Sequence, residues 1–193
     1  MFKFTSVATA AAMLAAAWVV MEPGGAPSAS AAQAAATAEN VKYNRYYEIR
    51  KDNRIYVFAE HQFYEAFKSS GELAYVRTKI GAGPNRETIV YAINSDQAKL
   101  PLTTPTLPEI LYADLANTLG GDDFFAILER DNRYYVSSDV GEFLNFHMSG
   151  EAAYARSKIG GGPNRKTLVV VHTKDEVGKP LTRVEQLAEQ KLR

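Results

Sequence analysis

Alternating hydrophobic and polar residues predict a β-hairpin in each half of the chain. In YYEIRKDNRIYVFA the alternation runs on both sides of Asp52-Asn53. In FFAILERDNRYYVS it runs on both sides of Asp131-Asn132. Asp and Asn tolerate the positive φ that a tight two-residue turn requires. We therefore expect each Asp-Asn pair to form the turn of a hairpin.

A short helical segment follows each predicted hairpin. EHQFYEAFKSSG places Tyr64 and Phe67 on one helix face, and SDVGEFLNFHMSG does the same with Phe143 and Phe146. A glycine ends each segment, at Gly71 and Gly150, and glycine is the residue that most often terminates helices.

A second hairpin is predicted after each helix. The segment AYVRTKIG alternates between two sets of residues, which therefore occupy opposite faces of a strand. One set is Val76, Thr78 and Ile80, and the other is Tyr75, Arg77 and Lys79. The loop GAGPN and the returning strand RETIVYAI complete the hairpin. The second half reads AYARSKIG, GGGPN and RKTLVVVH. A final helix with a Thr-x-x-Glu capping pattern, Thr106 to Glu109 and Thr182 to Glu185, is expected to end each half.

These matching patterns reflect an internal repeat. Residues 52–93 align with residues 131–172 without a gap, with 21 identities in 42 positions, and residues 70–90 contain 15 identities in 21. Such similarity indicates duplication. We predict an α+β fold of two tandem ββαββ(α) repeats, with antiparallel sheets packed as a pseudo-twofold pair. Repeat 1 covers 43–119 and repeat 2 covers 120–193.

The N-terminal segment has the pattern of a secretory signal peptide. Lys3 precedes an uncharged apolar run at residues 7–20, and small residues follow. The alternative is a membrane anchor, but the run is shorter than the ~20 residues that span a bilayer. We expect a signal peptide at 1–31, a flexible leader at 32–42, a periplasmic or secreted location and no stable membrane span after cleavage. The absence of cysteine excludes disulfides and lipid attachment through cysteine.

Composition and spacing restrict the classes of function. The chain has 22 Lys plus Arg and 22 Asp plus Glu, which argues against a general nucleic-acid partner. Its three histidines lack the spacing of a metal site, and no nucleophile motif is present, so no metal, cofactor or catalytic residue is predicted. The question of catalysis stays open, with a hydrolase using Glu72 or Glu151 as one alternative, but a binding protein is favoured.

The duplicated basic strip and glycine-rich loop form the predicted ligand site. Aromatic and guanidinium groups on one strand face suit a carboxylate, sugar or phosphate ligand, and a glycine-rich loop can present backbone N–H groups to an anion. The alternatives are a solvated strand face and a loop shaped only for its turn. The expected partner is a small anionic ligand or an envelope protein, and the competing function is a purely structural or protein-interaction module. The predicted residues are Tyr75, Arg77, Lys79, Asn85, Arg86, Tyr154, Arg156, Lys158, Asn164 and Arg165.

The segment NRIYVFAEHQFYEAFKSSGELAY resembles the hairpin–helix half of YHS-type domains. Tyr56, Phe58, Phe67 and Tyr75 occupy the places of that pattern's strand aromatics, late helical Phe and following Tyr. The resemblance covers about 23 residues in each half. The cysteines associated with metal in many such domains are absent, and the KIGxGPN hairpin lies outside the pattern, so the resemblance implies no function here.

Overall fold

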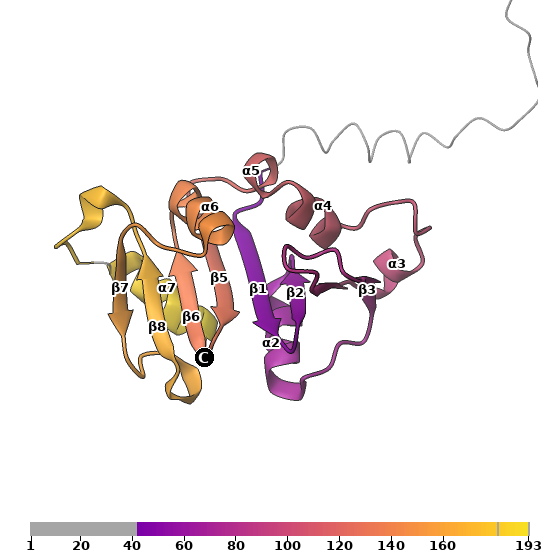
Figure 1. The fold of residues 1–193 in the computed structure, drawn as a ribbon, viewed down its shortest axis with the longest axis horizontal. Coiled ribbons are helices and arrows are strands. Elements are labelled where there is room, and N and C mark those ends of the chain that lie inside the picture. Colours follow the sequence, from indigo (N-terminus) through magenta and orange to yellow (C-terminus); the bar gives the residue numbers. More distant parts are fainter. Residues whose placement is uncertain (1–41, 181, 193) are drawn as a thin grey trace, which may run out of the picture. The chain divides into compact units, whose positions relative to one another are not determined.

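The computed structural model describes residues 42–180 and 182–192. Nearly all of the expected signal and leader segments, 1–31 and 32–42, therefore lies outside the described residues. The described chain is a mixed α+β arrangement built on one eight-stranded sheet (Figure 1). None of its helices combines the length and the hydrophobicity that a membrane-spanning helix needs.

The first half contains two hairpins separated by a helix and followed by three short helices. The strands are β1 (Arg45–Lys51), β2 (Arg54–Phe58), β3 (Val76–Lys79) and β4 (Thr88–Ala92). The helices are α2 (His61–Ser70), α3 (Ser95–Ala98), α4 (Leu107–Ala113) and α5 (Leu115–Thr118).

The second half has the same order of strands around a helix. The strands are β5 (Phe125–Arg130), β6 (Arg133–Ser137), β7 (Ala155–Lys158) and β8 (Thr167–Val171). The helices are α6 (Val140–Ser149), the 3₁₀ turns η2 (Pro163–Arg165) and η3 (Lys174–Glu176), and α7 (Thr182–Leu192).

Local predictions for the hairpins and helices are confirmed. Asp52 and Asn53 have φ of 52° and 55°, and Lys51 pairs with Arg54 across the turn. Gly71 and Gly150 end α2 and α6 with φ of 75° and 78°, in the left-handed region that favours glycine. The Thr106–Glu109 capping box is also present. The side chain of Thr182 lies outside the described part of the structure, so the second capping pattern stays a prediction.

The expectation of packed antiparallel sheets was wrong. All strands belong to one sheet in the order β3-β4-β2-β1-β5-β6-β8-β7. The four hairpins are antiparallel, but the pairs β1–β5, β2–β4 and β6–β8 are parallel. The physical reason lies in β1 and β5, where four consecutive residues are buried, so both faces of these strands are covered. Strands buried on both faces belong at the centre of a sheet.

The hydrophobic core is divided between the two faces of the sheet. Neighbouring β1 residues Tyr46 and Tyr47 belong to different clusters because successive side chains point to opposite faces. The face of Tyr47 is covered by α2 and α7, and the face of Tyr46 by α4 and α6. Each face is therefore covered by one helix from each half of the chain.

Candidate ligand-binding site

The two predicted basic strips do not share a groove. Arg77 lies on β3 and Arg156 on β7, which are the first and last strands of the sheet. Six strands separate them. Arg77 pairs with Tyr91 of one core cluster and Arg156 with Val170 of the other, so the two guanidinium groups also lie on opposite faces.

Arg77 is fully engaged with the chain itself. Its side chain is buried, and it donates hydrogen bonds to the carbonyls of Leu100 and Thr104, each at 2.7 Å. It also contacts the carboxylate of Glu109 at 3.3 Å. Lys79 reaches the other oxygen of that carboxylate at 3.2 Å. These contacts fasten the segment between β4 and α4 to the edge strand, which gives Arg77 a structural role.

The second strip is more open and makes fewer contacts. Arg156 donates one hydrogen bond to the carbonyl of Lys179 at 2.9 Å. Lys158 is exposed, Tyr154 is half-buried, and Tyr75 in the first strip is 49% exposed. The strips are thus similar in sequence but are used differently by the folded chain.

The glycine-rich loop of the first half holds one of its own carboxylates. Glu87 accepts hydrogen bonds from the backbone N–H of Asn85 at 2.7 Å and from its side-chain amide at 3.0 Å. Burial raises the pKa of Glu87, but these hydrogen bonds outweigh it and hold the pKa below its ordinary value. An anion from solution would have to compete with this carboxylate. Arg86, Asn164 and Arg165 are exposed and have positive φ.

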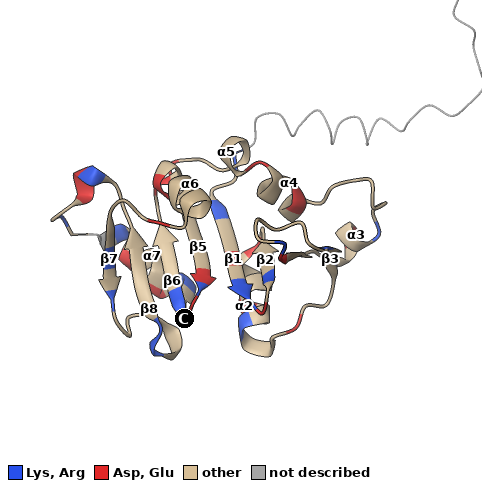
Figure 2. Ribbon diagram, viewed as in Figure 1, with Lys and Arg blue, Asp and Glu red and all other residues tan. Residues whose placement is uncertain are grey.

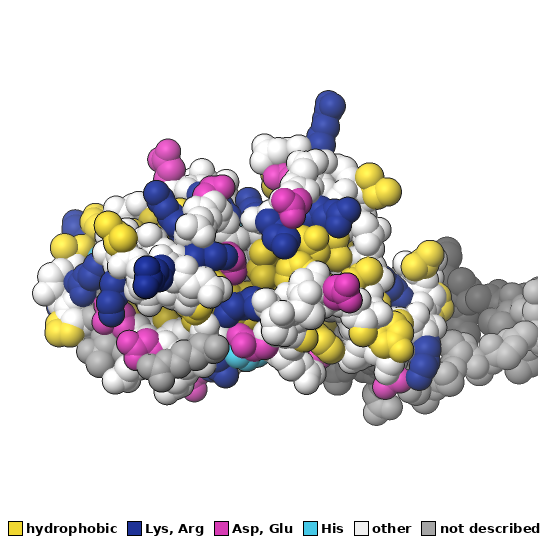
Figure 3. All heavy atoms as spheres, turned by 90° about the horizontal axis from the view of Figure 1, so that it is seen from below, with side chains coloured by type: hydrophobic (Ala, Val, Ile, Leu, Met, Phe, Trp, Pro, Cys, Tyr) yellow, Lys and Arg dark blue, Asp and Glu magenta, His cyan; other side chains and the backbone are white. Residues whose placement is uncertain are grey.

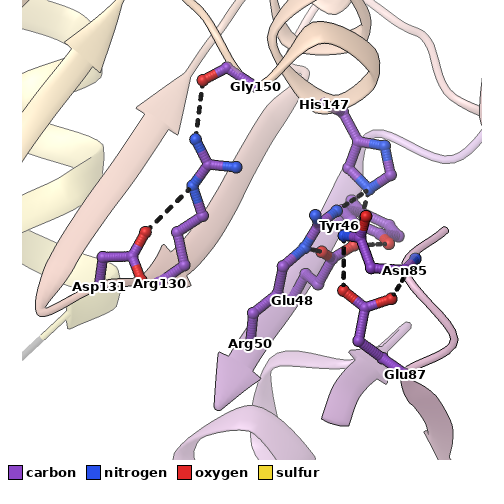
Figure 4. A network of polar contacts seen from close by, with 9 residues as sticks. All are labelled: Tyr46, Glu48, Arg50, Asn85, Glu87, Arg130, Asp131, His147 and Gly150. Carbon is purple, nitrogen blue, oxygen red and sulfur yellow. Dashed lines mark hydrogen bonds and ion pairs between the residues drawn. The ribbon is translucent and has the colours of Figure 1, made fainter. Parts of the chain in front are cut away.

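A buried polar network, which the sequence analysis did not single out, joins β1 to α6 (Figure 4). Glu48 is fully buried and accepts hydrogen bonds from Tyr46 Oη at 2.6 Å and from Arg50 Nε at 2.5 Å. His147 Nε2 lies 2.8 Å from the same carboxylate. No sequence signal pointed to it, because Glu48 and Arg50 occupy the polar positions of the alternation around Ile49.

The electrostatics of this network are dominated by Glu48. Burial alone would raise its pKa, but His147, Arg50 and Tyr46 lower it to about 2. Burial and the adjacent carboxylate raise the pKa of Tyr46. Among the described residues, no group of three or more His, Cys, Asp or Glu could hold a metal ion. We interpret the network as a polar connection within the core.

An open hollow lies between α2 and the β3–β4 edge of the sheet. It has a volume of about 430 Å³. Figure 3 shows hydrophobic side chains gathered in a hollow on this side of the domain, with Lys and Arg side chains around it. The lining residues are Arg54, Tyr56, Phe67, Gly71, Leu73, Val76, Thr78, Ile80, Thr88 and Val90.

Two basic residues border the aromatic floor of the hollow. The ring centroids of Tyr56 and Phe67 are 4.4 Å apart. Lys51 Nζ lies 5.5 Å from the centroid of Phe67, and Arg54 Nη1 lies 3.5 Å from Tyr56 Oη. Both basic side chains belong to exposed residues. The hollow therefore offers an apolar surface with positive charge at its border.

In the second half, a guanidinium group lies over the corresponding aromatic pair. Tyr135 and Phe146, each 79 positions after the floor aromatics, have ring centroids 4.5 Å apart. The Arg130 guanidinium lies over both rings, 5.3 Å and 5.1 Å from their centroids, and donates to the carbonyl of Gly150 at 2.7 Å. Lys51 is the residue aligned with Arg130, and its ammonium group lies over Phe67, 5.5 Å from the ring centroid.

None of the residues predicted from the sequence lines this hollow. The prediction selected the face of β3 with Tyr75 and Arg77, whereas Val76 and Thr78 on the opposite face line it. The alternation along β3 was the useful signal. It places hydrophobic residues on one face of an edge strand, and these residues either pack against another element or stay accessible. Comparison with protein-family models, with curated proteins and with solved structures found no match, so the site is defined by its geometry.

Proposed function

We propose that this chain is an exported, non-enzymatic binding protein that holds a small amphiphilic anion in the hollow beside α2. The observation that carries the proposal is an open hollow lined by Tyr56 and Phe67, with two exposed basic residues, Lys51 and Arg54, at its border. The pattern of residues 1–31 supports export to the periplasm or the exterior.

A duplication with pseudo-twofold symmetry is part of this proposal. The sheet order reads the same from both ends when each strand is replaced by its aligned counterpart, and β1 and β5 are the parallel pair at its centre. An axis along these strands would exchange the two faces, in agreement with α2 and α6 covering opposite faces. The two halves then present equivalent aromatic pairs, and a guanidinium group lies over the second.

The chemistry of the hollow favours a ligand with an apolar body and one negative group. Tyr56, Phe67 and Val90 offer ring and methyl surface, for which burial contributes about 25 cal/mol per Å² of apolar area. Arg54 is the one charged residue of the lining, and Lys51 lies beside it over Phe67. A medium-chain or aromatic carboxylate satisfies both requirements.

Calorimetric titration of the purified full chain with decanoate tests the proposal. Decanol, which has the same apolar body without the charge, serves as the ligand control. We expect saturable binding of decanoate that Arg54→Gln weakens roughly fivefold, the equivalent of about 1 kcal/mol for an exposed ion pair. Arg133→Gln is the matched control, because Arg133 is also exposed and follows the aligned turn.

A third variant separates the hollow from other sites. Val76 lines the hollow and is 44% exposed, so Val76→Trp is expected to fill it without disturbing the core and to abolish binding. Equal binding by the parent, Arg54→Gln and Val76→Trp would rule out this site. Equal affinity for decanol and decanoate would rule out an anion-selective site.

The second candidate is a protein-interaction module without a small-molecule site. The observation that favours it is the exposure of hydrophobic residues outside the hollow, including Leu102 at 88% and Met148 at 77%. This function predicts that decanoate does not bind, while the protein is retained by a specific envelope protein.

A further inference from the structure

All four hairpin connections lie at one end of the sheet. β1 and β5 are parallel, and β2, β4, β6 and β8 all run opposite to them. The edge strands β3 and β7 again run in the direction of β1. The four connections therefore lie at the same end of the sheet. They are the turns 51–54 and 130–133 and the loops 79–87 and 158–166. Figure 3 is seen from below, the side toward which β1 and β5 point in Figure 1.

This end is strongly basic in a chain without net charge. Among the exposed residues of these four connections, seven are Lys or Arg and two are Asp. Figure 2 shows basic positions at the lower ends of β1, β6 and β7. The chain as a whole has equal numbers of basic and acidic residues, so positive charge is concentrated here. The seven residues are Lys51, Arg54, Lys79, Arg86, Arg133, Lys158 and Arg165.

Each of the two longer loops also exposes an isoleucine. Ile80 is 88% and Ile159 is 91% exposed, and each follows a lysine and precedes a glycine with φ near +67°. We call residues 79–86 and 158–165 the two tips. The turn explains the glycines, but an exposed isoleucine contributes nothing to the folded core. The same exposed residue in both tips makes each tip apolar as well as basic.

We propose that the two tips bind the surface of an anionic lipid bilayer. The boundary between headgroups and acyl chains is apolar on one side and negatively charged on the other. Ile159 can enter the apolar side while Lys158 and Arg165 meet lipid phosphates. A nucleic acid would match the positive charge but offers no environment for an aliphatic side chain. The arrangement describes peripheral contact and requires no membrane-spanning segment.

The second tip allows this proposal to be tested apart from the hollow. Ile80 lines the hollow and also belongs to the first tip, so its substitution would affect both. Ile159, Lys158 and Arg165 are absent from the lining of the hollow. Changes at the second tip should therefore leave binding of decanoate unchanged.

A single fluorescent label reports on the tip directly. The chain has no cysteine, so Ile159→Cys introduces a unique site for an environment-sensitive dye in the full chain. The matched control is Leu102→Cys, since Leu102 is 88% exposed, close to the 91% of Ile159, but lies outside the tips. Vesicles of phosphatidylcholine with phosphatidylglycerol are compared with vesicles of phosphatidylcholine alone. Because the dye reports only on its own surroundings, contact of the apolar run 7–20 with lipid would not change the signal from residue 159.

We expect the dye at residue 159, and not at residue 102, to move to an apolar environment on vesicles that contain phosphatidylglycerol. Added salt should reverse the change. Lys158→Gln with Arg165→Gln in the labelled chain should weaken the interaction about 25-fold, or about fivefold for each charge. No change at residue 159, an equal change at residue 102, or an equal change on uncharged vesicles would overturn the proposal. The first outcome would point to a protein as the partner of the tips.

Discussion

The buried carboxylate of Glu48 is expected to make stability depend steeply on pH in the acid range. Glu48 lies on β1 and meets His147 of α6, so it connects the two halves of the chain through the core. In the unfolded chain the carboxyl group has its ordinary pKa of 4.5, whereas in the folded protein the pKa is about 2. The substitution Glu48→Gln removes the charge and keeps the shape.

The magnitude follows from the difference between these pKa values. A difference of about 2.5 pH units, at about 1.4 kcal/mol per unit, corresponds to roughly 3 kcal/mol of folding stability. Because the folded pKa is the lower one, this contribution is complete above about pH 4.5 and is lost as the pH falls toward 2. Glu48 is fully buried, so solvent does not screen its interactions.

Urea unfolding between pH 2.5 and pH 7 measures this contribution. We expect Glu48→Gln to be less stable than the parent by roughly 3 kcal/mol at pH 7 and the difference to shrink to less than about 1 kcal/mol at pH 2.5. Glu87 and Glu109 also have lowered pKa values and contribute to the slope of both proteins, so only the difference between the proteins is assigned to Glu48. Glu72→Gln, at an exposed glutamate, is the control. A difference that stays constant with pH would refute the reasoning.

Two further predictions concern arginine residues. Arg77→Met should lower the free energy of unfolding by roughly 2–4 kcal/mol, because the carbonyls of Leu100 and Thr104 lose their charged donor. Arg156→Met removes one hydrogen bond and should lower it by less than about 1 kcal/mol in the same urea titration. Equal losses in the two variants would contradict this explanation. Arg130→Ala should remove the guanidinium group from the second aromatic pair, so that calorimetry detects a second, weaker equivalent of decanoate. Unchanged stoichiometry would show that this second surface does not bind decanoate.

The local elements could be predicted from the sequence because their determinants lie close together in the chain. Asp52-Asn53 determines its turn through positive φ, and Gly71 determines the end of α2 in the same way. The pairing of β1 with β5 could not be predicted. It joins residues 80 positions apart, such as Arg45 and Phe125, and depends on both strands being covered on two faces.

The candidate site could be predicted only in part, and for a related reason. Charge and repetition drew attention to Arg77, but its partners at residues 100 and 104 become visible only when the chain folds back on β3. The hollow is defined by residues that look like ordinary core positions, among them Tyr56 and Phe67. Both are buried, at 8% and 5% exposed, so burial does not distinguish them. The open hollow beside them depends on how α2 lies against the β3–β4 edge.

The two outermost strands, β3 and β7, have four residues each and alternate small or hydrophobic side chains with Arg and Lys. A strand from another copy could form hydrogen bonds with only a few backbone groups of such a short edge, and the pairing would bring lysines of like charge together. The duplicated Arg-x-Lys pattern thus makes the sheet resistant to growth at both borders. Edge-to-edge pairing between two copies is therefore disfavoured at each border of the sheet.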